Sequence, residues 1–546
     1  MSKHNIFKGY VEAYKKEFAG YNANKLGKDI LAGVTVAAVA LPLALAFGVS
    51  SGASAAAGLI TAIIAGIIMG LLSGSSYQMS GPTGAMAAIL VSIVVQYEMK
   101  GVFIACFLSG IILLLAGIFK LGEIVSFIPM PVITGFTSGI AAIIALGQID
   151  NISGLSSSGD TTVSKISSYF TTPQSINLTA LAVGGAVILL MIIYPKKLTK
   201  FCPSSLAAII LATAASAIFK LPVESIGAIP RTIFLDTRLK LSDINLDIIK
   251  NLIMPAVSIA ALGLIESLLC GASAGRMKNE KLRADQELIS QGVGNIIIPF
   301  FGGVPATAAI ARTSVAIKAG GQTRLTSVIH ALVILLSMIA LGGIMSEIPL
   351  PALAGVLMVT AWRMNEWSTI KNIFRKKIKT AIFQFLITMT ATIIFDLTIA
   401  ILIGVLFSIV VFVLKVSDMQ VNVSDVDSSK LGDSNTNSEK YSRTSVVYIT
   451  GPLYFGTASR LEEKLSSLAE KDTVILSMRG VPFADLSGTL ALQELCLRLS
   501  NQNVAVYFTC VQPKVMEMFD RCGIKEHFGI ERFYWSTDKL LNSFSK

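Results

Sequence analysis

Charged residues are scarce in this chain. Lys, Arg, Asp and Glu make up only 14% of its 546 residues, while 53% are apolar and the mean hydropathy is +0.69. This amount of apolar surface exceeds what one water-soluble core buries. The composition therefore argues against an ordinary soluble protein and predicts that most of the chain lies in a lipid bilayer.

Cysteine and histidine are also few, with six and three residues. The cysteines lie far apart and lack the paired spacings of zinc sites or redox motifs, so we interpret them as small apolar residues. No pairing of a nucleophile with a base stands out, and no metal motif does either. We therefore expect no enzyme, no cofactor and no metal centre, and we expect the lone His330 to be a packing residue.

Long apolar runs are abundant instead. Runs of about 17 to 25 residues, the length that crosses a hydrocarbon core, follow one another from Asp29 to Lys415. The first is long enough to span, so we expect residues 1–28 to be retained rather than cleaved as a signal peptide. Fourteen spans are predicted, at 29–50, 52–73, 82–97, 102–120, 128–149, 176–194, 203–219, 251–273, 286–301, 306–320, 324–345, 350–363, 378–394 and 397–415.

The net charge of +11 does not indicate a nucleic-acid partner, because the Lys and Arg residues mainly flank the spans. Basic residues precede span one and follow spans six, eight and twelve, in the stretches 15–28, 196–200, 276–283 and 375–379. The positive-inside rule places all four in the cytoplasm. We predict a multi-pass protein of the plasma (cytoplasmic) membrane, a bacterial inner membrane included, with lipid around it and a cytoplasmic N-terminus. The Ser- and Thr-rich loop after span five should face outward.

A soluble domain is expected after the membrane region of residues 29–415. Residues 416–440 are rich in Ser, Asp and Asn and are predicted to form a flexible linker. Residues 441–546 alternate β-branched runs with helical patterns, which is typical of an α/β domain. An even number of spans places this domain in the cytoplasm.

Two membrane segments are interrupted in the same way. SGPTGAM at 80–86 precedes the short span three, and FGGVPATAAIART at 301–313 precedes the short span ten. A helix that begins inside the membrane points its unpaired N–H groups and positive dipole end into the protein, where they can bind an anion. The two segments are seven spans apart, as an inverted repeat with a site at the midplane predicts. Alternatively, these glycines only permit close helix packing.

Two of the charged residues inside predicted spans are candidates for a functional role. Arg312 lies near the start of span ten, and Glu266 is the only acidic residue of span eight. A charge in lipid needs a partner, a water-filled cavity or a substrate. Glu266 could pair with Arg312, carry a proton or bind a cation. A buried salt bridge that only fixes helix packing is the alternative for the pair.

At these motifs the chain resembles the SulP family of anion transporters, the sulfate permease group that includes pendrin and prestin. The resemblance runs from about Leu26 to the C-terminus. It rests on LPLALAFGVSSG, SGPTGA, IESLL, GGVPATAAIARTSVAIKAGGQTR and the C-terminal YITGPLYFGTASRLEEKL. It implies a seven-plus-seven inverted repeat divided into a core and a gate domain, a C-terminal STAS domain, and a homodimer.

The resemblance also implies a substrate site. The anion would contact Phe47 of span one, the two helix starts and Glu266 as the ion-coupling residue. The helix starts comprise Gly81, Pro82, Thr83, Gly84, Ala85, Ala308, Ala309, Ile310, Ala311 and Arg312.

Sodium-coupled relatives have Asp at the position of Glu266 and Thr at that of Ile310, which favours proton coupling here. Many relatives also carry a polar or acidic residue where this chain has Leu43, and some have Ser at the position of Ala311, so side-chain contacts to the anion should be few.

In the C-terminal domain, FADLSG at 483–488 resembles the loop of anti-sigma factor antagonists that carries a phosphorylatable serine. Ser487 would be that residue and would regulate binding of a cytosolic partner. An ordinary helix-capping role for Ser487 is the favoured alternative.

The leading hypothesis is a secondary active transporter of a small anion such as sulfate, bicarbonate or a dicarboxylate. It would work by proton symport or anion exchange with alternating access. The alternatives are a membrane anion sensor that signals through the STAS domain, and an anion channel built on the same helix ends.

Overall fold

The computed structural model describes residues 6–123, 128–157, 162–171, 175–195, 197–200, 202–395, 397–416, 419–426, 443–457, 461–463, 468 and 470–545. The chain divides into two compact units, Met1–Ser408 and Ile409–Lys546. The first contains almost all the apolar helices, and the second is an α/β unit.

Each of the fourteen predicted spans coincides with helical structure. The helices are α2 (Ala23–Ser50), α3 (Ala55–Leu72), α4 (Gly84–Ile118), α5 (Met130–Gly147), α8 (Leu178–Ile193), α9 (Ser204–Phe219), α10 (Leu246–Lys278), α11 (Ala284–Ile297), α12 (Ile310–Lys318), α13 (Leu325–Met345), α14 (Leu350–Met364), α16 (Lys379–Ile394) and α17 (Leu397–Val416). Spans three and four both lie in α4, which changes direction at Glu98, where φ is 57°. Six helices, namely α2, α3, α4, α5 together with α6, α10 and α13, are at least 18 residues long and apolar enough to cross a membrane.

In the described part of the first unit, four helices occur where no span is predicted. They are α1 (Ile6–Phe18), α6 (Ile149–Ser153), α7 (Thr162–Thr171) and α15 (Trp367–Arg375). The first unit also has short 3₁₀ segments, at 121–123, Leu198–Lys200, Leu241–Asp243 and Ile298–Phe301. The number of membrane crossings therefore stays a prediction.

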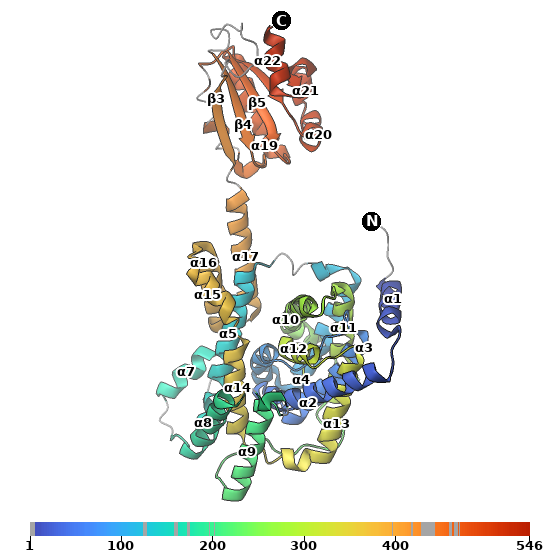
Figure 1. Ribbon diagram of the computed structural model, residues 1–546. Coiled ribbons are helices and arrows are strands. Elements are labelled where there is room, and N and C mark those ends of the chain that lie inside the picture. Colours follow the sequence, from blue (N-terminus) through green and yellow to red (C-terminus); the bar gives the residue numbers. More distant parts are fainter. Residues whose placement is uncertain are drawn as a thin grey trace. The chain divides into compact units, whose positions relative to one another are not determined.

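The helices of the first unit pack in two groups. The helices α2, α3, α4, α10, α11, α12 and α13 contact one another, and α5, α6, α8, α9, α14 and α16 form the second group. Figure 1 shows the groups as two adjacent bundles, with α5 and α14 in one and α2, α3 and α13 in the other. This division agrees with the core and gate domains that the family resemblance implies.

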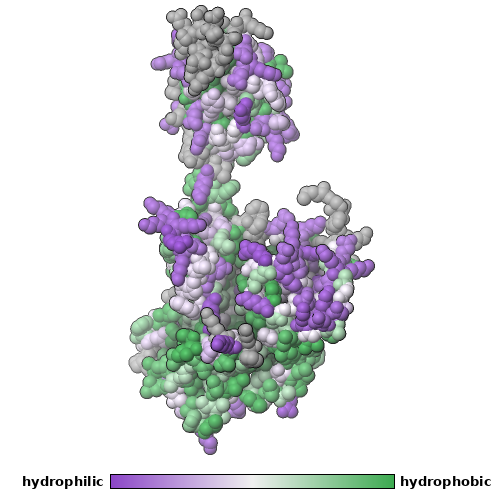
Figure 2. Space-filling model, viewed as in Figure 1, coloured by the Kyte–Doolittle hydropathy of each residue, from purple (hydrophilic) through white to green (hydrophobic). Residues whose placement is uncertain are grey.

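Apolar side chains cover much of the outer surface of this unit. Figure 2 shows hydrophobic residues over the part that holds α8, α9 and α13 in the same view, and hydrophilic residues gathered toward α1 and α15. Ile192, Phe219 and Ile344 are 68%, 73% and 66% exposed. Such a surface is unfavourable in water and favourable in lipid.

Polar contacts join several inter-helix segments on one face of the first unit. The ammonium of Lys278, at the end of α10, donates to Ser76 Oγ and to the carbonyls of Gly321 and Gln322. Arg324, just before α13, forms a buried ion pair of 2.7 Å with Glu17, which belongs to α1. The N-terminus and the segments after predicted spans two, eight and ten therefore lie together, as the parity of the predicted topology requires.

The second unit is a five-stranded mixed sheet with helices. Its strands are β3 (Gln420–Asp425), β4 (Thr444–Thr450), β5 (Thr473–Gly480), β6 (Ala505–Thr509) and β7 (Phe533–Tyr534), in that spatial order. The first pair is antiparallel and the others are parallel. The described helices are α19 (Leu486–Asn501), α20 (Pro513–Arg521), α21 (Ile524–Phe528) and α22 (Thr537–Ser545). Buried Val447, Leu476 and Phe508 form the core between these layers.

Two predictions about this unit are wrong. Residues 420–425, assigned to the flexible linker, form β3, because Val421 and Val423 alternate with polar residues and pair with β4. Residues 427–440 of the linker lie outside the described residues. Ser487 does not cap α19: Asp485 is the N-cap and its Oδ1 accepts from Gly488 N at 2.7 Å. Ser487 instead lies exposed in the first turn of that helix.

Candidate functional site

The two interrupted segments meet inside the first unit. Ser80–Gly81 forms β1 and Thr307–Ala308 forms β2, and the two strands pair antiparallel with Ser80 opposite Ala308. α4 begins directly after β1, and α12 begins directly after β2. This antiparallel pairing is the relation expected of two repeats with opposite orientation, and it brings the two helix starts together.

The two helix starts differ in how they are capped. Thr83 is the N-cap of α4, and its Oγ1 accepts from Met86 N at 3.3 Å. Ala309 is the N-cap of α12 and supplies no side-chain acceptor. At α12, Ile310 is 45% exposed, and the N–H groups of the first turn have no side-chain cap. An anion there would take the place of the missing cap.

Arg312 lies in the first turn of α12 and is only 1% exposed. Its Nη2 donates to the carbonyl of Pro82, while its Nη1 has no hydrogen-bond partner among the described residues. A Cβ at Gly81 would collide with this Nη1, so glycine lets the guanidinium approach β1. Arg312 makes no ion pair with Glu266 in the described part of the chain, so the hypothesis that the two form a salt bridge is wrong.

Glu266, in α10, instead joins the two interrupted segments. Its Oε2 accepts from Thr83 Oγ1 at 2.9 Å and from Thr307 Oγ1 at 2.5 Å. The two threonine hydroxyls are 3.4 Å apart. One carboxylate and two hydroxyls therefore converge between the helix starts, and sequence reasoning did not single out Thr307.

Phe47 lies where the family resemblance places it. It is 5% exposed, in α2. A Cβ at Gly84 would meet Phe47 Cε1 at 3.0 Å and would collide with Ile144 of α5. Phe47 and Ile144 therefore flank the start of α4 from the two helix groups, and Gly84 leaves room for both. Ala85 and Ala308, also predicted in this site, are 0% and 2% exposed, whereas Ala311 faces open space.

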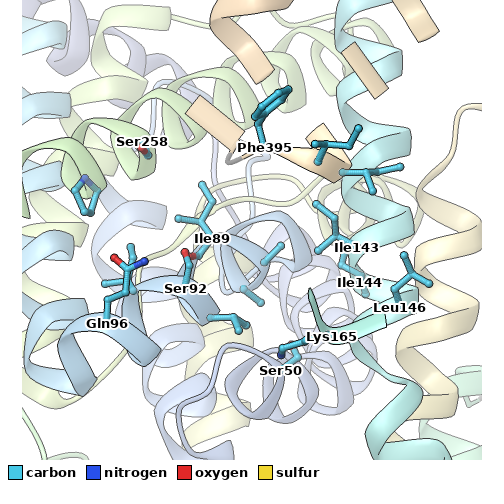
Figure 3. Close-up of a pocket in the computed structure, with 18 of the residues that line it drawn as sticks. Ser50, Ile89, Ser92, Gln96, Ile143, Ile144, Leu146, Lys165, Ser258 and Phe395 are labelled. Atoms are coloured by element: carbon cyan, nitrogen blue, oxygen red, sulfur yellow. The ribbon is translucent and has the colours of Figure 1, made fainter. Parts of the chain in front are cut away.

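A cavity of about 660 Å³ reaches the start of α4. Its lining includes Gly84, Ser92 and Gln96 of α4, Ile144 of α5, and Ser258 of α10. Figure 3 shows these walls, with Lys165, Ser50 and Phe395 among the labelled side chains. The cavity lies between the two helix groups and gives one helix start a path to open space.

A row of buried polar side chains on α11, here called the polar ladder, forms hydrogen bonds to both interrupted segments. Glu287, Gln291 and Asn295 follow one another at intervals of four, and each is 0% exposed. Gln291 Nε2 donates to Ser80 Oγ at 2.8 Å and to Glu287 Oε1 at 2.7 Å. Asn295 accepts from Ala306 N at 2.8 Å and donates to the carbonyl of the same residue at 3.0 Å. These residues position β1 and β2. Their spacing of four residues within one predicted span was the signal that sequence reasoning overlooked.

The fold and the paired helix starts define a class: polytopic membrane proteins with discontinuous helices that meet at a central site. Residues 26–391 match the model of the sulfate permease family, and residues 435–539 match the STAS domain. The chain belongs to the sulfate permease family, which is a family of transporters.

Individual relatives agree with this assignment. YvdB of Bacillus subtilis (strain 168), which carries the provisional name of sulfate transporter, is 33% identical over 96% of this chain and 99% of its own length. The bicarbonate transporter BicA of Picosynechococcus sp. is 28% identical over 94% of each chain.

Solved structures have the same fold. The murine Solute Carrier 26 family member A9 anion transporter in the inward-facing state superposes with a TM-score of 0.87, at 18% identity, over 100% of this chain and 96% of its own. The transmembrane domain of a cyanobacterial BicA superposes with a TM-score of 0.64, at 26% identity, over 71% of this chain and 98% of its own.

Proposed function

We propose that this protein is a secondary active transporter that carries a small oxyanion, sulfate or bicarbonate, between the starts of α4 and α12. The observation that supports it most directly is Arg312. Its guanidinium is buried beside two helix starts, and one of its nitrogens has no partner among the described residues. A buried donor without an acceptor is costly, and a bound anion removes that cost.

The anion in this proposal accepts hydrogen bonds from Arg312 Nη1 and from backbone N–H groups at the helix starts. The helix dipoles add positive potential at the same point. Phe47 and Ile144 provide apolar walls. These contacts recognise the negative charge and the size of the anion rather than its chemical identity.

We propose that Glu266 couples anion movement to a proton. When the two threonine hydroxyls move apart, a protonated Glu266 carboxyl can stay buried without their hydrogen bonds. When Glu266 ionises, its carboxylate accepts hydrogen bonds from both threonines again. Sodium is a second candidate, because Glu266, Thr83 and Thr307 bring three hard oxygen atoms together without any contribution from residue 310. Dependence of uptake on sodium at constant pH separates the two cations.

We propose cytoplasmic positions for the N-terminus and the STAS domain, in a chain without enzymatic activity that functions as a homodimer in the plasma membrane. The ends of α2, α5 and α16, which the topology prediction places outside, line the cavity at Ser50, Gly147 and Phe395. The cavity is then the outer access path. Ser487, exposed beside Asp485, is proposed as a phosphorylation site that controls a cytosolic partner.

The test is uptake of radiolabelled sulfate and bicarbonate into proteoliposomes, with and without an inward proton gradient, and with sodium or choline as the external cation. Arg312→Ala is expected to reduce uptake at least about tenfold, because a charge-assisted hydrogen bond is worth about 1.5–3 kcal/mol. Arg363→Ala is the control, since Arg363 lies in α14 of the second helix group and donates to the carbonyl of Met191.

The outcomes separate the hypotheses. Gradient-driven uptake that disappears in Arg312→Ala and in Glu266→Gln supports a proton-coupled carrier. Binding without flux contradicts transport and favours a sensor, and flux that never saturates favours a channel. Uptake that survives in Glu266→Gln with the same gradient dependence contradicts coupling through this residue.

A further inference from the structure

The cavity between the two helix groups has a single charged side chain among the described residues that line it, which is Lys165. Lys165 lies in α7, a helix within a segment whose sequence is dominated by Ser and Thr. The remaining lining is apolar or uncharged polar, with Ser50, Gln96 and Gln148 among the polar residues. The charge is therefore placed where it acts on whatever enters the cavity.

α7 is held in place by Asp150, whose two carboxylate oxygens both accept hydrogen bonds. Asp150 Oδ1 accepts from Tyr169 Oη at 2.8 Å and from Ser157 N at 3.1 Å, and its Oδ2 accepts from Ser157 Oγ at 2.5 Å. α7 also packs against α5 and α16. Lys165 is thus carried by an anchored helix, and it forms no ion pair with the carboxylates that the structure describes.

A cation without an ion-pair partner in a cavity with apolar walls raises the local concentration of anions, because the walls focus its field. We propose that Lys165 forms an outer capture site for the transported oxyanion, with Ser50 and Gln148 as hydrogen-bonding neighbours. The anion is held there before it moves to the start of α4 at Gly84, which lines the same cavity. This inference rests on the proposed transport function and adds a binding site to it.

The main experiment compares Lys165→Gln with Lys220→Gln in proteoliposomes. Lys220 ends α9, is exposed and does not line the cavity, so it controls for loss of one positive charge on the same predicted side. Lys165→Gln is expected to raise KM for external sulfate or bicarbonate about tenfold with kcat near that of the wild type. Lys165→Arg is expected to restore KM, and Lys220→Gln to leave it unchanged.

Chemical modification gives an independent readout of charge. In Lys165→Cys, a membrane-impermeant methanethiosulfonate that attaches a positive group is expected to lower KM again, whereas one that attaches a negative group raises it further. Wild-type protein treated in the same way corrects for the native thiols, of which Cys202, Cys510 and Cys522 are partly exposed. Opposite effects of reagents of similar size cannot arise from a purely structural role of the side chain.

The outcomes distinguish this site from the transport function itself. If the wild type takes up sulfate or bicarbonate and Lys165→Gln behaves like Lys220→Gln, the capture site is disproved and transport stands. If kcat falls in all variants at position 165, charged or not, a structural role replaces the proposal. If the wild type neither transports nor binds either anion, the proposed function fails and the capture site falls with it.

Discussion

At the residue scale, the site depends on pairs in which one small residue makes room for a larger one. Gly81 leaves space for Arg312, and Gly84 leaves space for Phe47 and Ile144. Both glycines belong to the first interrupted segment, and each therefore has a task beyond close packing of helices. Both tasks concern the volume next to the helix starts, which is where the anion is proposed to bind.

Gly81→Ala is expected to abolish most anion uptake while the protein stays folded. The added methyl group would force the Arg312 guanidinium away from β1, and this side chain is flexible enough to move. Uptake in proteoliposomes and thermal unfolding in detergent measure the two effects. Gly185→Ala is the control, because nothing lies within 4 Å of a Cβ at that position of α8. Normal uptake by Gly81→Ala would show that the position of Arg312 does not matter.

Thr83 performs two tasks with one hydroxyl group. Its hydroxyl caps α4 and donates to Glu266. Thr83→Val removes both bonds and is expected to lower stability by about 1 kcal/mol and to change the cation dependence of uptake. Thr83→Ser keeps the hydroxyl and should behave as the wild type. If Thr83→Val has wild-type cation dependence, the hydroxyl takes no part in coupling.

The sequence revealed those site residues whose type is unusual within an apolar membrane span. Arg312 and Glu266 stood out as charges within apolar spans, and the Gly and Pro clusters marked the helix starts. Thr307 and Ser80 did not stand out, because hydroxyl residues are common in membrane helices and bond to their own backbone. Only the pairing of β1 with β2 shows that these hydroxyls meet Glu266 and Gln291.

At the element scale, α11 acts as the support for both interrupted segments. Asn295→Leu is expected to lower the thermal stability and to reduce uptake, because it leaves the N–H and C=O of Ala306 buried without partners, at about 1–3 kcal/mol for each group. Asn372→Leu in the exposed helix α15 is the control. Full stability of Asn295→Leu would contradict a supporting role for the ladder.

Helices of the membrane unit were predictable because long apolar runs leave few alternatives in a bilayer. Which helices pack against one another was not predictable, since lipid-facing and protein-facing helix surfaces are equally apolar. α7 was missed because Ser and Thr dominate its segment. β3 was missed because a six-residue edge strand carries only two valines among polar neighbours.

At the scale of the whole first unit, α1 is joined to the first helix group by a buried ion pair. Glu17 and Arg324 form an ion pair with side chains only 8% and 3% exposed, and the Arg324 guanidinium also lies over the rings of Tyr10 and Tyr14. Glu17→Gln is expected to cost about 3 kcal/mol of stability, because it leaves the Arg324 charge buried. Thermal unfolding measures this, and Glu12→Gln, at an exposed position of α1, should change little.

The contacts of Lys278 and Arg324 gather the N-terminus and the segments after three even-numbered spans on one face, whereas the cavity is lined by ends of odd-numbered spans. A membrane-impermeant maleimide applied to intact cells is therefore expected to label Lys220→Cys and to leave Lys281→Cys unlabelled until the cells are permeabilised. The unsubstituted chain provides the background from native cysteines. Labelling of Lys281→Cys in intact cells would reverse the orientation. The cavity would then open to the cytoplasm, and Lys165 would bind the anion on its release rather than on its entry.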